Sequence, residues 1–555
     1  MHDAGRIAAR PCAAAKTPPR VAIGSFAAPA SRQRRPARPR RAGAGAGIAR
    51  RRRFRRRLVF PEISDIPNPS VALVKQGARR PATPSAHKKE KIVAKILENV
   101  EHVVVVMFEN RSFDTMLGWL YPPGTQPAHV LPARSSPQFD GLKPGMSNPS
   151  KSGKPIAVTL EATNSVIPDP QETFVNVTSQ ILGPRDAQAP WPPMQGFVVN
   201  YETTQTTDPG HVMQCHSVAQ LPTLTALARA YAVSDAWFAS VPSQTWPNRA
   251  FAHAGTSNGR VNNGEIPDPL EWNVPTIFDA LSSIGASWAV YSDTLVTPSL
   301  THTMFPTLWD DKYADRFRHF PDFVAACKHD ALPQYAFIEP SFLFEPNDQH
   351  PPHDVSAGDA FLHGIWMALS TSPGWPRTLL VVTYDEHGGC FDHVRPPTNA
   401  TPPDAASTPG DETFDFDRFG VRVPAVVVSP YIEAGTVFRS PTNVPYDHTS
   451  ILATLRDWLG IPPDRMLKSA RIANAPTLAQ LFTRSTPRTD LPTIAAPATD
   501  FVHPPPTAPL NDLQKSLVTG TSRRDGHDPA ASVAPITTRQ HALDFFERRA
   551  QGKPA

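Results

Sequence analysis

Short, almost wholly apolar segments constrain the fold of this chain more than any other feature. Residues 101–108 (EHVVVVMF) carry four consecutive valines, and such a continuous run indicates a strand buried on both faces. The other segments of this kind are residues 287–291, 334–338, 378–384 and 423–428. Helical apolar spacing lies among them at residues 224–230, 276–283, 323–328, 358–370 and 449–459. This alternation predicts an α/β fold in which helices flank a largely parallel sheet.

The basic charge is concentrated at the N-terminus. Residues 1–57 hold 17 Arg and Lys against one acidic residue, so the net +5 of the whole chain conceals +16 in this stretch and −11 in the remainder. Because residues 1–60 are rich in Ala, Arg, Pro and Gly without hydrophobic periodicity, we expect a disordered basic tail. An acidic body does not attract a phosphate backbone, which argues against a nucleic-acid partner and favours cation binding.

The sequence shows no complete targeting signal. No run of about 18 apolar residues occurs, so no transmembrane helix is expected. Arg34-Arg35 and residues 50–57 look like twin-arginine signals, but no apolar segment follows. This basic tail could contact acidic surfaces, or it could be an export or transit sequence. It could also be an upstream extension that results from a misplaced start codon. The four cysteines form no CxxC pair, which argues against a disulfide framework and a thiolate zinc site.

The body is expected to begin near Lys91, with a short helix over residues 92–99, and to form a catalytic domain over residues 91–484. Residues 485–555 form a Pro/Ala/Thr-rich extension that ends in an amphipathic helix over residues 539–549. We expect this terminal helix to pack on the body rather than to anchor in a membrane.

Two polar clusters directly follow predicted strands. Glu109 and Asn110 follow the valine run and offer hard oxygen ligands for Mg²⁺, Ca²⁺ or Mn²⁺, although a polar turn with a helix cap is the alternative. Asp385 and Glu386 follow residues 378–384, and adjacent carboxylates there are costly unless a cation or hydrogen bonds neutralise them. His387, next in the chain, titrates near neutrality. Ligands of parallel sheets bind at these strand ends.

A third cluster surrounds Thr245. Its hydroxyl stands two residues before Pro247 and is expected in a rigid turn, where Asn248 and Arg249 can hydrogen-bond phosphoryl oxygens. A hydroxyl bound to a metal has a lowered pKa and becomes a usable nucleophile. An ordinary proline turn is the alternative.

Histidines supply the candidate acids. His350 or His353 could protonate a leaving oxygen. The prolines between them exclude two metal ligands on one helical face, which favours a catalytic loop histidine over a zinc pair. Asp447-His448 precedes a helix and could serve the site or only cap that helix.

Together these segments resemble the phosphoesterase family of phosphatidylcholine-hydrolysing phospholipases C and related acid phosphatases, which includes the plant non-specific phospholipases C. The segments that carry the resemblance are residues 109–114 with Gly118, 245–249, 350–354, 385–389, 392–393, 420–424 and 447–450. The resemblance implies an alkaline-phosphatase-like fold, a nucleophile at Thr245 and His350 near the leaving group. The metal or phosphate-site residues that it implies are Glu109, Asn110, Asp385 and Glu386. Cys390-Phe391 departs from the aromatic pair more usual in the family.

The expected activity is phospholipase C cleavage of a phosphatidylcholine-type phospholipid to diacylglycerol and a phospho-headgroup, through a phosphothreonine at Thr245 and with a divalent metal ion. Peripheral membrane contact and export would accompany it, because relatives in the family are often exported. An acid phosphatase or phosphodiesterase with a soluble substrate is the alternative. A non-catalytic protein that binds anionic surfaces through residues 1–60 is the third hypothesis.

Overall fold

The computed structural model of the protein describes residues 97–184, 191–294 and 296–552. The tail expected over residues 1–60, the domain start near Lys91 and residues 92–96 of the first predicted helix lie outside this part of the chain. The described residues all belong to one compact unit, Pro81–Ala555.

The valine-rich segment forms the centre of the main sheet. β1, His102–Phe108, lies between β10, Tyr335–Glu339, and β11, Thr378–Tyr384, and it is parallel to both. Residues 103–108 are each at most 3% exposed, because helices cover both faces of the sheet. β-branched side chains suit a strand of this kind, since their restricted rotamers pack well on a pleated surface.

Within the described residues the main sheet has nine strands in the order β2-β13-β7-β12-β11-β1-β10-β8-β9. The strands not yet given are β2 (His129–Leu131), β7 (Ala232–Ser234), β8 (Trp288–Ser292), β9 (Phe317–His319), β12 (Ala425–Val428) and β13 (Thr436–Phe438). β12 is antiparallel to β11 and to β7, and the other pairings are parallel. The sheet is therefore mixed but largely parallel, as the sequence predicts. Two small sheets pair β3 (Ser147–Pro149) with β4 (Pro155–Ala157) and β5 (Thr159–Leu160) with β6 (Gln214–Cys215).

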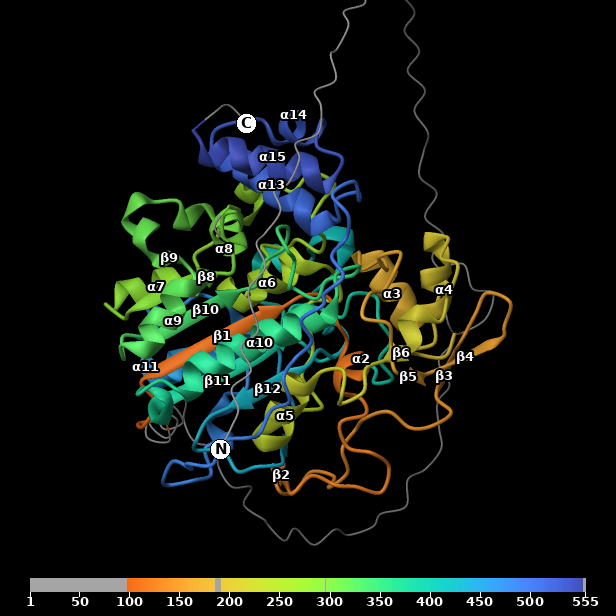
Figure 1. Ribbon diagram of the computed structural model, residues 1–555, viewed down its shortest axis with the longest axis horizontal. Helices are drawn as coiled ribbons and strands as arrows, with labels where there is room; N and C mark the ends of the chain where they lie inside the picture. The colour runs from red at the N-terminus through yellow and green to blue at the C-terminus, as the bar shows by residue number, and fades with distance from the viewer. Residues whose placement is uncertain (1–96, 185–190, 295, 553–555) are drawn as a thin grey trace, which may run out of the picture. The chain divides into compact units, whose positions relative to one another are not determined.

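The helices predicted between the strands are present. They are α5 (Pro222–Ala230), α7 (Ile277–Ser283), α9 (Phe320–Lys328), α10 (Val355–Ser370) and α11 (Thr449–Leu459). Figure 1 shows α10 in front of β1 and β11. Shorter or unpredicted helices are α2 (Phe113–Leu117), α3 (Phe174–Leu182), α4 (Phe197–Tyr201), α6 (Thr245–Ala254), α8 (Leu300–Met304) and α12 (Ala470–Asn474).

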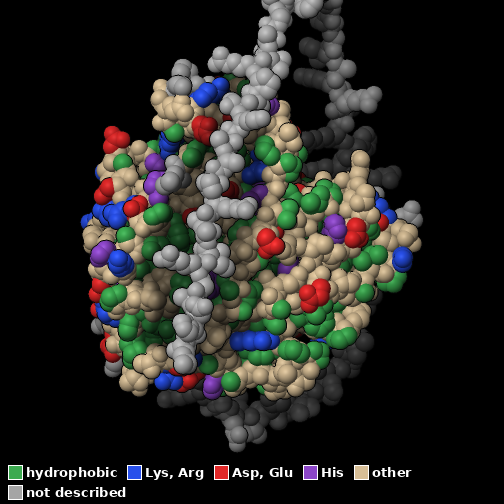
Figure 2. Space-filling view, viewed as in Figure 1, with side chains coloured by type: hydrophobic (Ala, Val, Ile, Leu, Met, Phe, Trp, Pro, Cys, Tyr) green, Lys and Arg blue, Asp and Glu red, His purple; other side chains and the backbone are tan. Residues whose placement is uncertain are grey.

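The C-terminal extension folds onto the body. It contains α13 (Asp512–Arg524), α14 (Pro529–Val533) and α15 (Arg539–Ala550), and α13 packs against α8 (Figure 1). Phe545 and Phe546 of α15 are buried. None of the helices in the described residues is long and apolar enough to cross a bilayer. On the face drawn in Figure 2, basic and acidic side chains are interspersed.

Candidate active site

Two neighbouring strand ends bring the predicted acidic residues together. β1 and β11 pair in a register that places Phe108 opposite Tyr384, so the segments that follow both strands leave the sheet at one edge. The backbone N–H of Asp385 donates to the carbonyl of Phe108 at 3.1 Å, which extends the pairing by one residue. The fully buried residues at this edge are Glu109, Asn110, Asp385 and Glu386.

Asn110 and Gly388 lock these two segments against each other. Asn110 has a left-handed backbone with φ of 53°, a conformation that Asn tolerates better than most residues. Its N–H donates to Oδ1 of Asp385 at 2.9 Å. Gly388 also has a positive φ, 61°, and a Cβ at this position would lie 2.1 Å from the carbonyl oxygen of Asn110. Only glycine permits this approach, which explains the first glycine after His387.

Thr245 lies in the first turn of α6, and its hydroxyl is directed at Glu109 and Asn110. Its hydroxyl donates to Oε2 of Glu109 at 3.0 Å and lies 3.3 Å from Oδ1 of Asn110. The expectation of a rigid turn here was wrong, because α6 begins at Thr245 and Pro247 occupies its first turn. Proline is tolerated there, since the first N–H groups of a helix have no partner within it. The N-terminal end of α6 therefore favours negative charge beside the Thr245 hydroxyl.

Arg249 lies one turn further along α6 and pairs with Glu109. Its Nε donates to Oε1 of Glu109 at 2.8 Å, and its Nη2 donates both to the same oxygen and to the carbonyl of Met107. Nη1 of Arg249 is buried and has no hydrogen-bond partner. One guanidinium nitrogen is thus left for a group that enters the site.

Asn248 braces the segment before α6. Its Oδ1 accepts from the N–H of Val241 at 2.9 Å, and its Nδ2 donates to the carbonyls of Val241, Ser243 and Gln244 at 2.9–3.1 Å. Both amide hydrogens are therefore engaged by the backbone. The geometry places Asn248 as a support for Thr245 rather than beside an incoming phosphoryl group.

The strand-end carboxylates are incompletely satisfied. Oδ2 of Asp385 and Oε1 of Glu386 are buried without a hydrogen-bond partner. Burial, reinforced by Asp385, raises the pKa of Glu386 well above its ordinary value, and burial likewise raises the pKa of Glu109, against the opposing charge of Arg249. Buried carboxylate oxygens without partners are costly. These oxygens and Oδ1 of Asn110 are hard donors of the type that suits Mg²⁺, Ca²⁺ or Mn²⁺. Glu109, Asp385 and Glu386 are not one of the groups of His and acidic side chains in the described residues whose ligand atoms all lie within 4.8 Å of one another.

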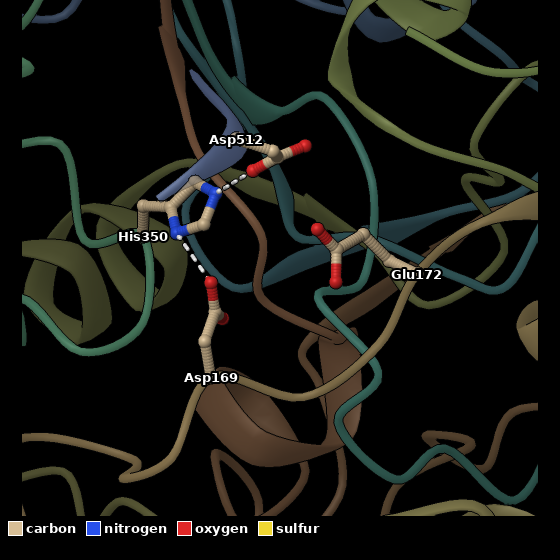
Figure 3. Close-up of side chains that lie close together, drawn as sticks. All are labelled: Asp169, Glu172, His350 and Asp512. Atoms are coloured by element: carbon tan, nitrogen blue, oxygen red, sulfur yellow. Dashed lines mark ion pairs between the residues drawn. The ribbon is translucent and has the colours of Figure 1, made fainter. Parts of the chain in front are cut away.

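His350 lies beside this set and belongs to a second acidic group, drawn in Figure 3. Its Nε2 is 3.1 Å from Nδ2 of Asn110 and 3.5 Å from Asp512, and its Nδ1 is 3.8 Å from Asp169. The carboxylate of Glu172 faces the same space (Figure 3). Burial lowers the pKa of His350, but these carboxylates outweigh burial and raise it well above its ordinary value.

The other two predicted histidines bond to different partners. Nδ1 of His353 bonds to Asp348 at 2.6 Å, and Nε2 of His387 is 2.8 Å from Oε1 of Gln180. Burial lowers the pKa of His353, and it lowers that of His387 to about 3. His387 Nδ1 is 3.2 Å from Glu386, so it contacts the acidic set at its rim. The expectation that His387 titrates near neutrality was wrong, because burial of the ring lowers its pKa.

Three acidic residues of the site were not anticipated. Asp169 and Glu172 come from the loop before α3, and Asp512 begins α13 in the extension. A signal for α13 exists: Asn511 caps the helix and Gln514 returns the bond, a capping box followed by apolar residues. Nothing in the sequence indicates that this helix reaches His350.

A separate charged group lies nearby and is built differently. Arg422 donates to both Asp114 and Asp392, and His393 bonds to Asp114 at 2.6 Å. The arginine thus occupies the position from which a cation would neutralise these carboxylates. The His/carboxylate groups of the described residues that could hold a metal ion are Asp169, Glu172, His350 with Asp512, and Asp114, Asp392 with His393. His448, left open above, holds the carbonyl of Asp385 through Nε2 at 2.6 Å.

The family model and two relatives that match this chain are all named as phosphoesterases or phospholipases C. The sequence model described as "Phosphoesterase family" matches residues 100–462. The chain is 35% identical over 412 residues to non-specific phospholipase C3 of Arabidopsis thaliana, covering 71% of this chain and 75% of that protein. It is 30% identical over 414 residues to phospholipase C B of Mycobacterium tuberculosis, covering 66% of this chain and 74% of that protein.

Solved structures overlap with the chain only loosely. A protein of the alkaline phosphatase superfamily from Vibrio parahaemolyticus covers 71% of this chain and 79% of its own, at 11% identity and a TM-score of 0.28. The lipoteichoic acid synthase LtaP of Listeria monocytogenes covers 84% and 99%, at 12% identity and a TM-score of 0.31. Similarity at TM-scores this low supports no inference about the reaction.

Proposed function

The chain belongs to the phosphoesterase family, and on this premise we propose that it is a phospholipase C that uses Thr245 as its nucleophile. It is a phosphoric ester hydrolase of the phospholipase C type, as the relatives at 30–35% identity indicate. The proposed substrate is a phosphatidylcholine-type phospholipid, cleaved to diacylglycerol and a phospho-headgroup.

The observation that carries the assignment is the environment of the Thr245 hydroxyl. It is buried, lies at the N-terminal end of α6, and donates to Oε2 of Glu109 at 3.0 Å. A threonine that only stabilised the helix would not need a buried carboxylate within hydrogen-bond distance of its oxygen. A nucleophile needs a proton acceptor of this kind within hydrogen-bond reach.

The proposed metal-binding residues are Glu109, Asn110, Asp385 and Glu386. The partnerless oxygens of Asp385 and Glu386 support this set, and Thr245 adjoins it. A bound divalent ion would lower the pKa of the Thr245 hydroxyl and neutralise charge on the phosphoryl oxygens. The group around Glu172 is the alternative position, because its four side chains offer ligand atoms within 4.8 Å of one another.

The remaining steps are assigned to residues of the chain. Thr245 Oγ1 passes its proton to Glu109 and attacks phosphorus, while the free Nη1 of Arg249 contacts an equatorial phosphoryl oxygen. The ester bond to the alcohol breaks, and His350 gives its proton to the departing oxygen. Water then attacks the phosphothreonine with His350 as base, and the proton on Glu109 returns to Thr245. Asn248, His353 and His387 are proposed to position this machinery.

Two other hypotheses make different predictions. A soluble phosphatase would use the same residues on a small monoester. A non-catalytic surface-binding protein would depend on residues 1–60 and not on Thr245. Peripheral membrane contact and export are proposed together with the lipase activity, since a phospholipid substrate lies at a membrane surface.

The test is hydrolysis of phosphatidylcholine and of p-nitrophenyl phosphate by the parent protein, Thr245→Ala and Thr245→Ser, each with and without a chelator. We expect Thr245→Ala to lose on the order of 10⁴-fold in kcat, as nucleophile deletions do. Thr245→Ser should retain measurable turnover, because it keeps the hydroxyl. Turnover of the monoester alone would contradict the lipase assignment, and full activity of Thr245→Ala would contradict the nucleophile.

A further inference from the structure

An apolar groove runs along the junction between the body and the C-terminal extension. It has a volume of about 530 Å³, within the range of about 300–1,000 Å³ common for small-molecule sites. The side chains that give it its apolar character include Ile167, Pro168, Pro352, Val502, Pro505 and Leu510. One wall thus comes from loops of the body and the other from the proline-rich stretch before α13.

The groove adjoins His350 of the proposed active site through two of its lining residues. Asp169 and Asn511 line the groove, and both approach His350: Asn511 Nδ2 is 3.4 Å from Nδ1 of His350, and Asp169 Oδ2 is 3.8 Å from it. His350 is the proposed proton donor to the departing alcohol. The histidine proposed to protonate the alcohol is therefore separated from the apolar groove only by the side chains of Asp169 and Asn511.

The outer end is open and apolar. Ile167 is 59% exposed and Val502 is 70% exposed, which makes them two of the most exposed large hydrophobic residues of the described chain. Apolar side chains at the rim of a groove mark a contact with an apolar partner more often than a random surface does. The groove thus has polar lining residues next to His350 and exposed apolar residues at its rim.

The extension wall is fixed in place by hydrogen bonds. The N–H of Val502 donates to Asp354 at 3.1 Å, and the N–H of Arg539 donates to the carbonyl of Ala508 at 3.0 Å. The guanidinium of Arg539 also bonds to the carbonyls of Pro504 and Leu343. A preformed wall lowers the ordering cost of binding a flexible chain.

We propose that this groove is the binding site for an acyl chain of the substrate, the chain carried by the alcohol that leaves from phosphorus. The inference deepens the proposed function and rests on it only for the identity of that alcohol. Three observations support it: the apolar lining, the contacts of the lining residues Asp169 and Asn511 with His350, and the exposed apolar rim. An amphiphile with a phosphate at one end and a hydrocarbon at the other matches the polarity of the groove from end to end.

The test measures binding of monomeric alkylphosphocholines with 6, 8 and 10 carbons by calorimetry. Thr245→Ala protein is used throughout so that the ligand is not consumed. Each buried methylene strengthens binding about fourfold at most, so affinity should rise up to about 250-fold from the six-carbon to the ten-carbon ligand. Val502→Asp and Ala508→Trp, which charge the rim and fill the groove, should each reduce this gain below about tenfold. Leu270→Asp, at a residue 53% exposed and outside the groove, is the matched control and should keep the full gain.

The outcomes separate the groove from the activity. A chain-length gain that is equal in Val502→Asp, Ala508→Trp and Leu270→Asp would overturn the proposal, because the hydrocarbon would then bind elsewhere. If affinity does not depend on chain length in Thr245→Ala protein without a second substitution, the proposal is overturned as well. Either result leaves the nucleophile test at Thr245 unaffected, since binding is measured without turnover. Val502→Asp alters a residue that is mostly exposed, so loss of folding does not confound it.

Discussion

The same two segments of chain build two charged groups of opposite character. The segment after β1 supplies Glu109 to one group and Asp114 to the other, and the segment after β11 supplies Asp385 and Asp392. In the Asp114–Asp392 group an arginine and a histidine satisfy the carboxylates. In the Glu109–Asp385 group some buried oxygens have no partner at all.

The difference teaches how to distinguish a site from a structural ion pair. Both groups are acidic, buried and a few residues apart in sequence, so composition does not separate them. Arg422 makes the Asp114–Asp392 group self-sufficient, because its guanidinium bonds to both carboxylates and to two backbone carbonyls. A buried carboxylate oxygen without a hydrogen-bond partner favours protonation or a bound cation. The unsatisfied group is therefore where a ligand belongs.

The largest expected effect is on activity at the unsatisfied group. Asp385→Asn removes the charge with little change in shape, and we expect kcat/KM for phosphatidylcholine to fall about 10³-fold, the several kcal/mol that a metal ion contributes. The variant should bind less divalent metal by elemental analysis, while the melting temperature of the chelated protein does not fall. Glu172→Gln is the control and should retain metal. A metal content that depends on Glu172 instead would place the ion beside His350.

The next effect is on stability at the satisfied group. Asp392→Asn is the same chemical change, but it takes one of two carboxylates from the fully buried Arg422. We expect a loss of about 3 kcal/mol in the free energy of unfolding, as when one partner of a buried pair is removed. Urea denaturation measures it, with Asp385→Asn as the matched comparison. If Asp392→Asn instead lost metal and kept its stability, the distinction between the two groups would collapse.

The smallest effect is the pH dependence of the satisfied group. Burial opposes the charge on His393, but Asp114 and Asp140 raise its pKa to about 9, with the opposing charge of Arg422 nearby. Because the folded pKa exceeds the unfolded value of about 6.5, its contribution is complete below pH 6.5 and is lost as pH rises towards 9. We expect a loss of about 1–2 kcal/mol over this window after allowance for partial solvent exposure.

Denaturation of the parent protein and of His393→Gln between pH 6 and 9 measures this contribution. The variant should show a flatter profile, since a glutamine can keep a hydrogen bond to Asp114 without titrating. Parallel profiles would show that His393 is not the titrating group. The metal content of His393→Gln should equal that of the parent protein, in contrast to Asp385→Asn.

Much of the site could be predicted because it lies at strand ends. Glu109 and Asp385 each follow an apolar run, and parallel neighbours necessarily deliver such residues to one edge. The conformation of Thr245 was harder, since Pro247 reads equally as a turn or as a first helical turn, and α6 shows the latter. Asn248 was assigned to phosphate from its chemistry alone, yet its amide hydrogens are engaged by the backbone.

The amino-acid sequence by itself determined the strands, their largely parallel sheet and the acidic character of one sheet edge, because hydrophobic periodicity and the chemistry of strand ends are local properties. Only the tertiary structure decided which carboxylates have partners. Arg422 reaches Asp114 across 308 positions, and Asp512 approaches His350 from a different part of the chain. Contacts at such separations depend on how whole elements pack, and no local pattern records them.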